Sequence, residues 1–208
     1  MYTHIKICGI TNTNDALLAE QLGASAIGFV FYKKSPRFVL YEEAREISGI
    51  LGPFIARVGV FVDENPDVVM NTIHTVGLTA VQLHGSENAD YIHEISGVRI
   101  IKAFRIGKNF DPGLLGHYNV SAYLLDTYNK NGYGGTGKTF DWEKALACSR
   151  YGRIILAGGL NAGNISNAIK TVNPWGVDVS SGLEVKPGKK DEVKMRLFFE
   201  AVYREYIK

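Results

Sequence analysis

A regular alternation of two kinds of segment runs along all 208 residues and constrains the fold more than any other feature. Short runs rich in β-branched or aromatic residues alternate with segments that have the apolar spacing of amphipathic helices. No Ser/Pro-rich linker or compositional break divides the chain. Strands that alternate with helices build a parallel sheet, and eight such units fit a closed barrel at the small end of its usual length. We therefore predict an α/β fold, a single (β/α)8 TIM barrel with eight parallel strands, as one domain over residues 1–208.

The predicted strands are HIKICGI (4–10), AIGFVF (26–31), IARVGVF (55–61), AVQLH (80–84), RIIKAFRI (99–106), AYLLDT (122–127), RIILAG (153–158) and GVDVSS (176–181). The predicted helices lie in TNDALLAEQLG, YEEAREISGIL, NPDVVMNTIHTVG, ENADYIHEIS, the weaker DPGLLGH, DWEKALACS, NAGNISNAIKT and DEVKMRLFFEAVYREYI. Thr13 is the predicted N-cap of the first helix. An open doubly wound sheet is the structural alternative, although that fold usually needs fewer strands and gathers its function at one switch point.

Composition and charge limit the partners and the compartment. Hydrophobic residues make up 46% and charged residues 21% of a chain whose net charge is +2, so a nucleic acid is not an expected partner. The N-terminus has no positively charged leader, and no run approaches the roughly 18 apolar residues of a membrane span. Cys8 and Cys148 are too few for a disulfide framework and lack metal-site spacing. We expect free thiols in a cytoplasmic protein without membrane contact, either a monomer or a homodimer.

Polar residues recur where the predicted strands end, which is where a barrel of this kind builds its active site. The candidates are Cys8, Arg37, His84, Arg105 and Asp126. Each has an ordinary structural explanation: a strand cysteine is usually a small buried apolar residue, and a loop arginine or a histidine near the core edge need do no chemistry. Asp126 is harder to explain in that way, because it ends the apolar LLD run and an unpaired buried charge is costly.

Two glycine-rich segments, LAGGLNAGN and DVSSGLE, follow the last two strands. Backbone amides, serine hydroxyls and a helix N-terminus together form an anion site, and the loops after strands seven and eight hold phosphate in many barrels. Ordinary tight turns are the alternative. We predict that a phosphorylated small molecule binds at Gly158, Gly159, Ser180, Ser181 and Gly182.

Side chains alternate in direction along a strand, so Lys6 shares a face with Cys8, and Asp178 shares one with Ser180. Strands one and eight are neighbours in a closed barrel, which predicts that Lys6 and Asp178 approach each other inside it. One hypothesis is that Lys6 helps to hold Cys8 as a thiolate, because a nearby cation lowers the pKa of a thiol. An ion pair that only fills the barrel is the equal alternative.

Eight segments taken together resemble the phosphoribosylanthranilate isomerases nearly end to end and in order. They are KICGIT, GFVFYKKSPRFV, VGVFVDE, VQLHGSE, LLDT, GGTGKTFDW, LAGGLNAGN and GVDVSSGLE. The resemblance implies an Amadori rearrangement in tryptophan biosynthesis: the aminoaldose N-(5-phosphoribosyl)anthranilate becomes the aminoketose 1-(2-carboxyphenylamino)-1-deoxyribulose 5-phosphate. It also implies that the reaction needs no metal and no organic cofactor.

The resemblance assigns roles to individual residues. Asp126 is implied to be the general acid that opens the furanose ring, and Cys8 the general base that removes the C2 proton. Arg37 is implied to pair with the anthranilate carboxylate, and His84 and Asp178 to lie close to the substrate. The glycine-rich segment 132–138 is expected to be either a loop that moves over the ligand or a long exposed connection.

Three other functions of a phosphate-binding barrel fit the residues of this chain less well. The related histidine-pathway isomerases have an aspartate on the first strand, where this chain has Cys8. Indole-glycerol-phosphate synthases use a lysine and glutamate set that we do not find here. A barrel that only binds a phosphorylated metabolite as a sensor would need neither Cys8 nor Asp126.

Overall fold

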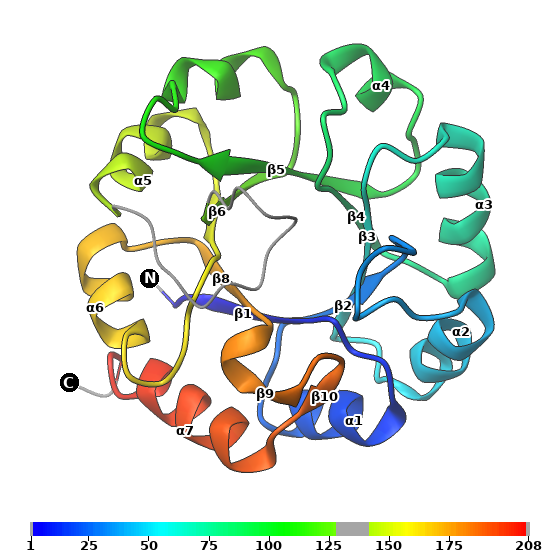
Figure 1. The fold of residues 1–208 in the computed structure, drawn as a ribbon, viewed down its shortest axis with the longest axis horizontal. Helices are drawn as coiled ribbons and strands as arrows, with labels where there is room; N and C mark the ends of the chain where they lie inside the picture. Colours follow the sequence, from blue (N-terminus) through cyan, green and yellow to red (C-terminus); the bar gives the residue numbers. More distant parts are fainter. Residues whose placement is uncertain (1, 128–141, 207–208) are drawn as a thin grey trace.

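Eight parallel strands close into a barrel in the computed structural model, which describes residues 2–127 and 142–206 (Figure 1). The strands are β1 (His4–Cys8), β2 (Ala26–Val30), β3 (Ala56–Phe61), β4 (Ala80–Leu83), β5 (Arg99–Ile106), β6 (Ala122–Thr127), β7 (Ile154–Leu156) and β8 (Gly176–Val179). Each strand pairs with the next one along the chain, and β1 pairs with β8. The predicted barrel is confirmed, and the open doubly wound alternative is excluded.

Helices surround the barrel (Figure 1). They are α1 (Thr13–Gln21), α2 (Tyr41–Ile50), α3 (Pro66–Val76), α4 (Ala89–His93), α5 (Glu143–Cys148), α6 (Ile165–Val172) and α7 (Glu192–Tyr203). Short 3-10 helices occur at η1 (Pro112–His117), η2 (Ser149–Tyr151) and η3 (Ser181–Leu183). The weak DPGLLGH segment is thus a 3-10 helix, as its proline and two glycines disfavour an α-helix.

Several predicted boundaries were wrong. The N-cap of α1 is Asn12, whose side chain accepts a hydrogen bond from the backbone N–H of Asp15, so Thr13 is the first helical residue instead. Asparagine and threonine both cap helices, and the sequence alone did not separate them. The first strand ends at Cys8 rather than Ile10, because Gly9 has a φ of 73°, in the left-handed region that interrupts a strand.

A small antiparallel hairpin, β9 (Glu184–Lys186) and β10 (Lys189–Lys190), was not predicted. It follows β8 and lies near α1 and α7 in Figure 1. Asp15 on α1 fixes the hairpin, since its carboxylate accepts from the backbone N–H of Lys190 at 2.7 Å and from the Lys189 ammonium at 2.7 Å. These contacts place the hairpin beside the C-terminal end of β1.

Within the described residues, the buried apolar side chains form three clusters. The largest lies between the barrel and its helices and includes Ile7, Phe29 and Phe198. A second cluster consists of small or branched side chains such as Ala80, Ala122 and Ile155, on strands of the barrel. The third consists of Cys8, Val30 and Val60, at the C-terminal ends of their strands. The barrel is therefore a packed core at most levels, and an opening is left only where its layers of side chains end.

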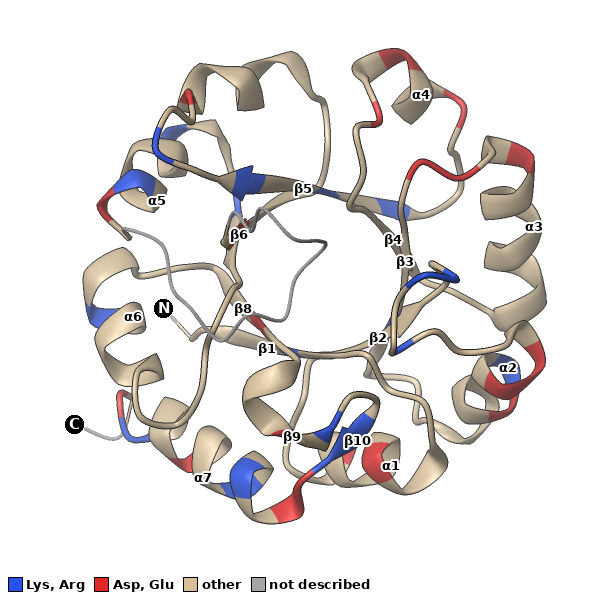
Figure 2. Ribbon diagram, in the orientation of Figure 1, with Lys and Arg blue, Asp and Glu red and all other residues tan. Residues whose placement is uncertain are grey.

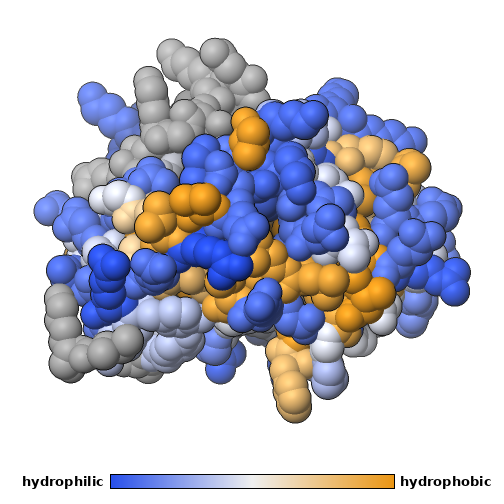
Figure 3. Space-filling model, turned by 90° about the horizontal axis from the view of Figure 1, so that it is seen from below, coloured by the Kyte–Doolittle hydropathy of each residue, from blue (hydrophilic) through white to orange (hydrophobic). Residues whose placement is uncertain are grey.

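Charged residues lie mostly on the surrounding helices and loops, with fewer on the barrel strands (Figure 2). Figure 3 shows hydrophilic residues over much of one side of the molecule, with hydrophobic residues in a smaller area across its middle. No helix among the described residues is long and apolar enough to cross a membrane.

Candidate active site

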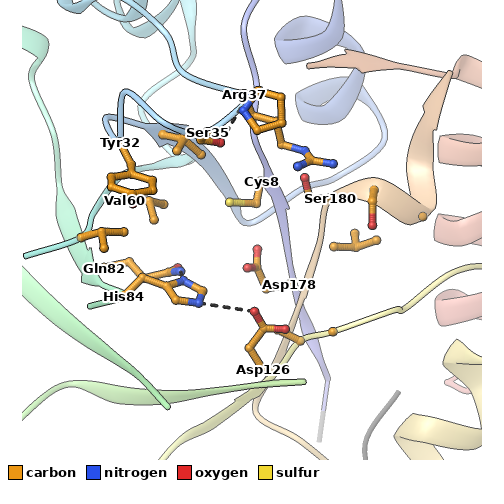
Figure 4. Close-up of a pocket in the computed structure, with 18 of the residues that line it drawn as sticks. Cys8, Tyr32, Ser35, Arg37, Val60, Gln82, His84, Asp126, Asp178 and Ser180 are labelled. Carbon is orange, nitrogen blue, oxygen red and sulfur yellow. Dashed lines mark hydrogen bonds and ion pairs between the residues drawn. The ribbon is translucent and has the colours of Figure 1, made fainter. Parts of the chain in front are cut away.

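A cavity of about 520 Å³ lies at the C-terminal ends of the barrel strands. Its lining contains every residue predicted for the site except Arg105, namely Cys8, Arg37, His84, Asp126, Gly158, Gly159, Asp178, Ser180, Ser181 and Gly182. Figure 4 shows several of these side chains converging from different strands around one space. The volume is in the range of small-molecule sites. Sequence positions 8 to 182 are therefore brought to one place by closure of the barrel.

Lys6 and Asp178 form a buried ion pair beneath this cavity. The Lys6 ammonium lies 2.8 Å from Asp178 Oδ1, and the two side chains are only 5% and 9% exposed. The two residues are opposite each other in the β1–β8 register, which confirms the predicted approach. Burial by itself lowers the pKa of Lys6, but the charges of Asp178 and Cys8 and the hydrogen bonds to them outweigh it and raise that pKa. Lys6 is thus held as a cation.

The surroundings of Cys8 act on the pKa of its thiol in both directions. Burial and the negative charge of Asp178 raise the pKa of the Cys8 thiol above its ordinary value. Lys6 and Lys190 act in the opposite direction, as the hypothesis required, but they do not outweigh burial. Lys6 therefore stabilises the thiolate without making it the resting form.

Asp126 contacts different groups with its two carboxyl oxygens. Oδ1 accepts a hydrogen bond from the backbone N–H of Thr127 at 2.8 Å, and Oδ2 lies 3.3 Å from Nε2 of His84 (Figure 4). The other ring nitrogen of His84 lies 2.9 Å from the side-chain amide nitrogen of Gln82, a residue that is 1% exposed. The imidazole is thus fixed between a buried amide and the carboxyl group. Each carboxyl oxygen of Asp126 therefore has one neighbouring nitrogen, the backbone N–H of Thr127 at Oδ1 and the imidazole of His84 at Oδ2.

The two glycine-rich loops meet at one side of the cavity. A Cβ atom on Gly182 would collide with the backbone carbonyl of Leu160, so only glycine permits this close approach of the β7 and β8 loops. The side-chain amides of Asn161 and Asn164 donate to the carbonyl of Gly159 at 3.2 and 2.9 Å. The loops are therefore ordered side by side, with serine hydroxyls and glycine backbone at the surface of the cavity. Such a cradle suits an anion.

Arg37 is engaged by a carboxylate of the protein. Its Nε and Nη2 atoms donate to Glu184 at 2.9 and 2.7 Å, and both side chains are largely buried, at 13% and 4% exposure. Lys190 donates to the same carboxylate at 2.9 Å and to the carbonyl of Cys8 at 2.6 Å. Burial favours protonation of Glu184, but Arg37 and Lys190 outweigh burial and lower its pKa.

Three residues of the site were not identified from the sequence. Gln82 and Glu184 lie in the quoted segments VQLHGSE and GVDVSSGLE, which was the only signal for them, and nothing pointed to Lys190.

Three further predictions concern Arg105, the segment 132–138 and Cys148. Arg105 donates to the carbonyl of His84 at 3.3 Å instead of lining the cavity. The predicted loop 132–138 lies outside the described residues. Cys148 is buried in α5, as expected for packing, and burial raises its pKa to about 11.

Comparisons with known proteins agree with this geometry. Residues 5–201 match the family model described as N-(5'phosphoribosyl)anthranilate (PRA) isomerase. An N-(5'-phosphoribosyl)anthranilate isomerase from Geobacter sp. (strain M21) is 50% identical over 196 residues, 94% of this chain and 96% of the relative.

Two solved structures are similar along nearly their whole length. A phosphoribosyl anthranilate isomerase in complex with reduced 1-(o-carboxyphenylamino)-1-deoxyribulose 5-phosphate has a TM-score of 0.86 and 40% identity, covering 97% of this chain and 99% of that chain. Monomers generated from the dimeric enzyme of Thermotoga maritima give a TM-score of 0.84 at 38% identity, with the same coverage of 97% and 99%.

Proposed function

The chain belongs to the N-(5'-phosphoribosyl)anthranilate isomerase family, and we propose that Cys8 and Asp126 are the general base and the general acid of its reaction. The reaction is the isomerisation of N-(5-phosphoribosyl)anthranilate to 1-(2-carboxyphenylamino)-1-deoxyribulose 5-phosphate, a step of tryptophan biosynthesis. One observation carries the proposal: a thiol and a carboxyl group line the same cavity, beside a cradle of glycines and serines.

The acid step begins at Asp126. With its proton on Oδ2, Asp126 protonates the furanose ring oxygen, the C1–O bond breaks, and the electron pair on the anthranilate nitrogen forms a Schiff base at C1. Hydrogen bonding from Thr127 holds Oδ1, and His84 contacts Oδ2, so the carboxyl group is oriented from both sides. His84 is thereby a positioning residue for the acid.

The base step falls to Cys8. The thiolate takes the proton from C2, and the electrons of that C–H bond move to form an enolamine, which tautomerises to the ketone. Burial makes the thiolate the minor form at neutral pH, and the nearby Lys6 and Lys190 stabilise it when it forms. The proposed mechanism uses opposite protonation states on the two sides of the sugar: an anionic base from β1 and a neutral acid from β6.

The other site residues bind the substrate. The phosphate is held by the Gly158, Gly159, Ser180, Ser181 and Gly182 cradle. Arg37 pairs with the anthranilate carboxylate, a contact suited to the planar guanidinium group. Asp178 holds Lys6 next to the reacting carbon.

We also infer the setting in which the protein works. It is one domain over residues 1–208, it acts in the cytoplasm as its free thiols suggest, and it binds no nucleic acid. It is a monomer or a homodimer. Light scattering at several concentrations would decide between the two states.

The function is tested by a fluorescence time course. Phosphoribosylanthranilate is generated in place from anthranilate and phosphoribosyl pyrophosphate by a transferase, and its signal is followed with the native protein and with Asp126→Asn. The native protein should consume the substrate, and the variant should be slower by about 10²- to 10⁴-fold because it cannot donate the proton. Binding without consumption by the native protein would favour the sensor function instead.

A further inference from the structure

We propose that Glu184 is a positioning residue that makes the site selective for substrates bearing a carboxylate, because it fixes which edge of Arg37 the ligand can use. This inference rests on the proposed role of Arg37 and goes beyond it. Sequence analysis assigned no role to Glu184, and Glu184 does not line the cavity, whereas Arg37 does. Glu184 therefore acts through Arg37 rather than on the ligand.

The argument begins with the geometry of the guanidinium group. Arginine has five N–H donors in a planar group, and Nε with Nη2 forms its side-on edge. Glu184 takes one donor from each of these two nitrogens, at 2.9 and 2.7 Å. Three N–H donors, two on Nη1 and one on Nη2, are left over. They form the end-on edge, which is the second edge able to bind a carboxylate in a bidentate manner.

The orientation of Arg37 is constrained from several directions. Glu184 is only 7% exposed, and besides Arg37 it accepts from Lys190 at 2.9 Å and from the backbone N–H of Gly188 at 3.3 Å. The aliphatic stem of Arg37 lies over Gly9, where an added Cβ would approach Arg37 Cδ to 2.6 Å. The Ser180 hydroxyl also donates to the Glu184 carboxylate at 3.4 Å. A carboxylate held by five hydrogen bonds cannot rotate freely, so the arginine paired with it has one available direction.

The charge of this cluster favours an anionic partner. Arg37 and Lys190 both donate to the single carboxylate of Glu184. Lys190 has no exposed side-chain surface, it also donates to the carbonyl of Cys8, and burial lowers its pKa. Lys6 is balanced by Asp178. Whenever Lys190 is protonated, the Arg37, Lys190 and Glu184 cluster therefore carries one more positive than negative charge, and Arg37 presents that charge to the cavity.

These observations predict a loss of selectivity when Glu184 is changed. Without its carboxylate, Arg37 can rotate, and its end-on edge is no longer directed in advance at the ligand. The loss should be specific to the carboxylate of the substrate. A substrate without that group gains little from a fixed Arg37, so its turnover should change much less.

The experiment compares two substrates, N-(5-phosphoribosyl)anthranilate and N-(5-phosphoribosyl)aniline, which lacks the carboxylate. For Glu184→Gln we expect kcat/KM to fall about 100-fold on the anthranilate substrate, mainly through KM, and less than about 5-fold on the aniline substrate. A fall of equal size on both substrates would mean a merely structural role and would overturn the inference. Glu184→Asp, which keeps the negative charge for Lys190, should show the same change in ratio if the glutamine variant does not fold.

Two further variants separate this inference from the function that it rests on. Glu192 on α7 accepts from Nε and Nη2 of Arg196 in the same side-on manner but is exposed, so Glu192→Gln is a matched control that should leave both substrates unchanged. Arg37→Met should abolish the preference for the carboxylate. If Arg37→Met loses the preference for the carboxylate and Glu184→Gln keeps it, the inference about Glu184 fails while the role of Arg37 stands. If Arg37→Met keeps the preference, the proposed role of Arg37 fails first.

Discussion

The two ends of the barrel differ in chemistry rather than in the size of their cavities. The cavity at the N-terminal end is larger, about 680 Å³ against about 520 Å³ at the C-terminal mouth. Small or apolar residues such as Ala26, Ala80 and Ala122 form much of its wall, and its arginines, Arg99 and Arg153, are exposed at the rim. Lys6 also borders this cavity, but its ammonium is paired with Asp178, which lines the C-terminal cavity.

At the mouth, by contrast, ionisable groups are buried and paired. Lys6 with Asp178 and Arg37 with Glu184 are ion pairs of low exposure, and Asp126 contacts His84. Burying a charge is costly unless it is paired and hydrogen-bonded, so such a set must be built by several elements at once. Partnered buried charge is therefore a better guide to the site than cavity volume.

The largest difference between buried, paired charge and exposed charge should appear in stability when a buried cation is removed. Lys6→Met leaves the Asp178 carboxylate buried without its partner, which should lower the free energy of unfolding by about 3–5 kcal/mol. The exposed Arg99 at the other end provides the matched control, since Arg99→Met should change stability by no more than about 0.5 kcal/mol. Denaturant unfolding would measure both, and equal losses would contradict the comparison.

The same Lys6→Met protein tests the effect of Lys6 on the thiol. Lys6 lowers the pKa of Cys8, so its removal should move the pH dependence of Cys8 alkylation to still higher pH. Peptide mass spectrometry would follow Cys8, with the buried Cys148 as an internal reference. An unchanged profile would leave Lys6 as an ion pair that only fills the barrel.

Lowering the pH should have a smaller effect on stability, through the carboxylate of Glu184. The pKa of Glu184 is lowered in the folded protein from an ordinary value of 4.5, so its carboxylate contributes stability above that pH. The contribution is lost as the pH falls below 4.5 and through the lowered pKa, where the folded protein must also take up the proton. Unfolding measured from pH 7 downward should show the difference in stability between native protein and Glu184→Gln shrinking over this window. A constant difference would mean that Glu184 is not charged in the fold.

The smallest effect is expected from one or two added methyl groups on β2, either at its first residue or at its middle one. Ala26→Val extends into the N-terminal cavity and should leave kcat/KM within about 2-fold, with stability unchanged or raised by up to about 1 kcal/mol. Gly28→Ala, two residues along, places a Cβ about 2.9 Å from the Cys8 sulfur and 3.1 Å from the Lys6 ammonium, and should lower turnover at least 10-fold. Similar turnover for the two variants would remove the distinction between the ends.

Local patterns in the sequence were sufficient for the barrel and for about half of the residues that line the cavity. Strand and helix periodicity predicted the eight units, and alternation along β1 and β8 predicted that Lys6 meets Asp178, because closure fixes which strands are neighbours. The strand-end rule then placed Cys8, His84 and Asp126 at one mouth. The N-cap was wrong because Asn12 and Thr13 have similar capping propensities, a difference of tenths of a kcal/mol at most.

The sequence by itself determined which residues face the barrel interior and which segment forms each strand, since these depend on residues close together in the chain. The tertiary structure alone decided the exact strand ends, the partners of Arg37 and Lys190, and the pKa of Cys8. Arg37 meets Glu184 across 147 positions, and Lys190 meets the carbonyl of Cys8 across 182. The raised pKa of Cys8 likewise depends on burial by several strands and on Asp178. Such pairings and desolvation are set by three-dimensional proximity, which no local pattern of side chains encodes.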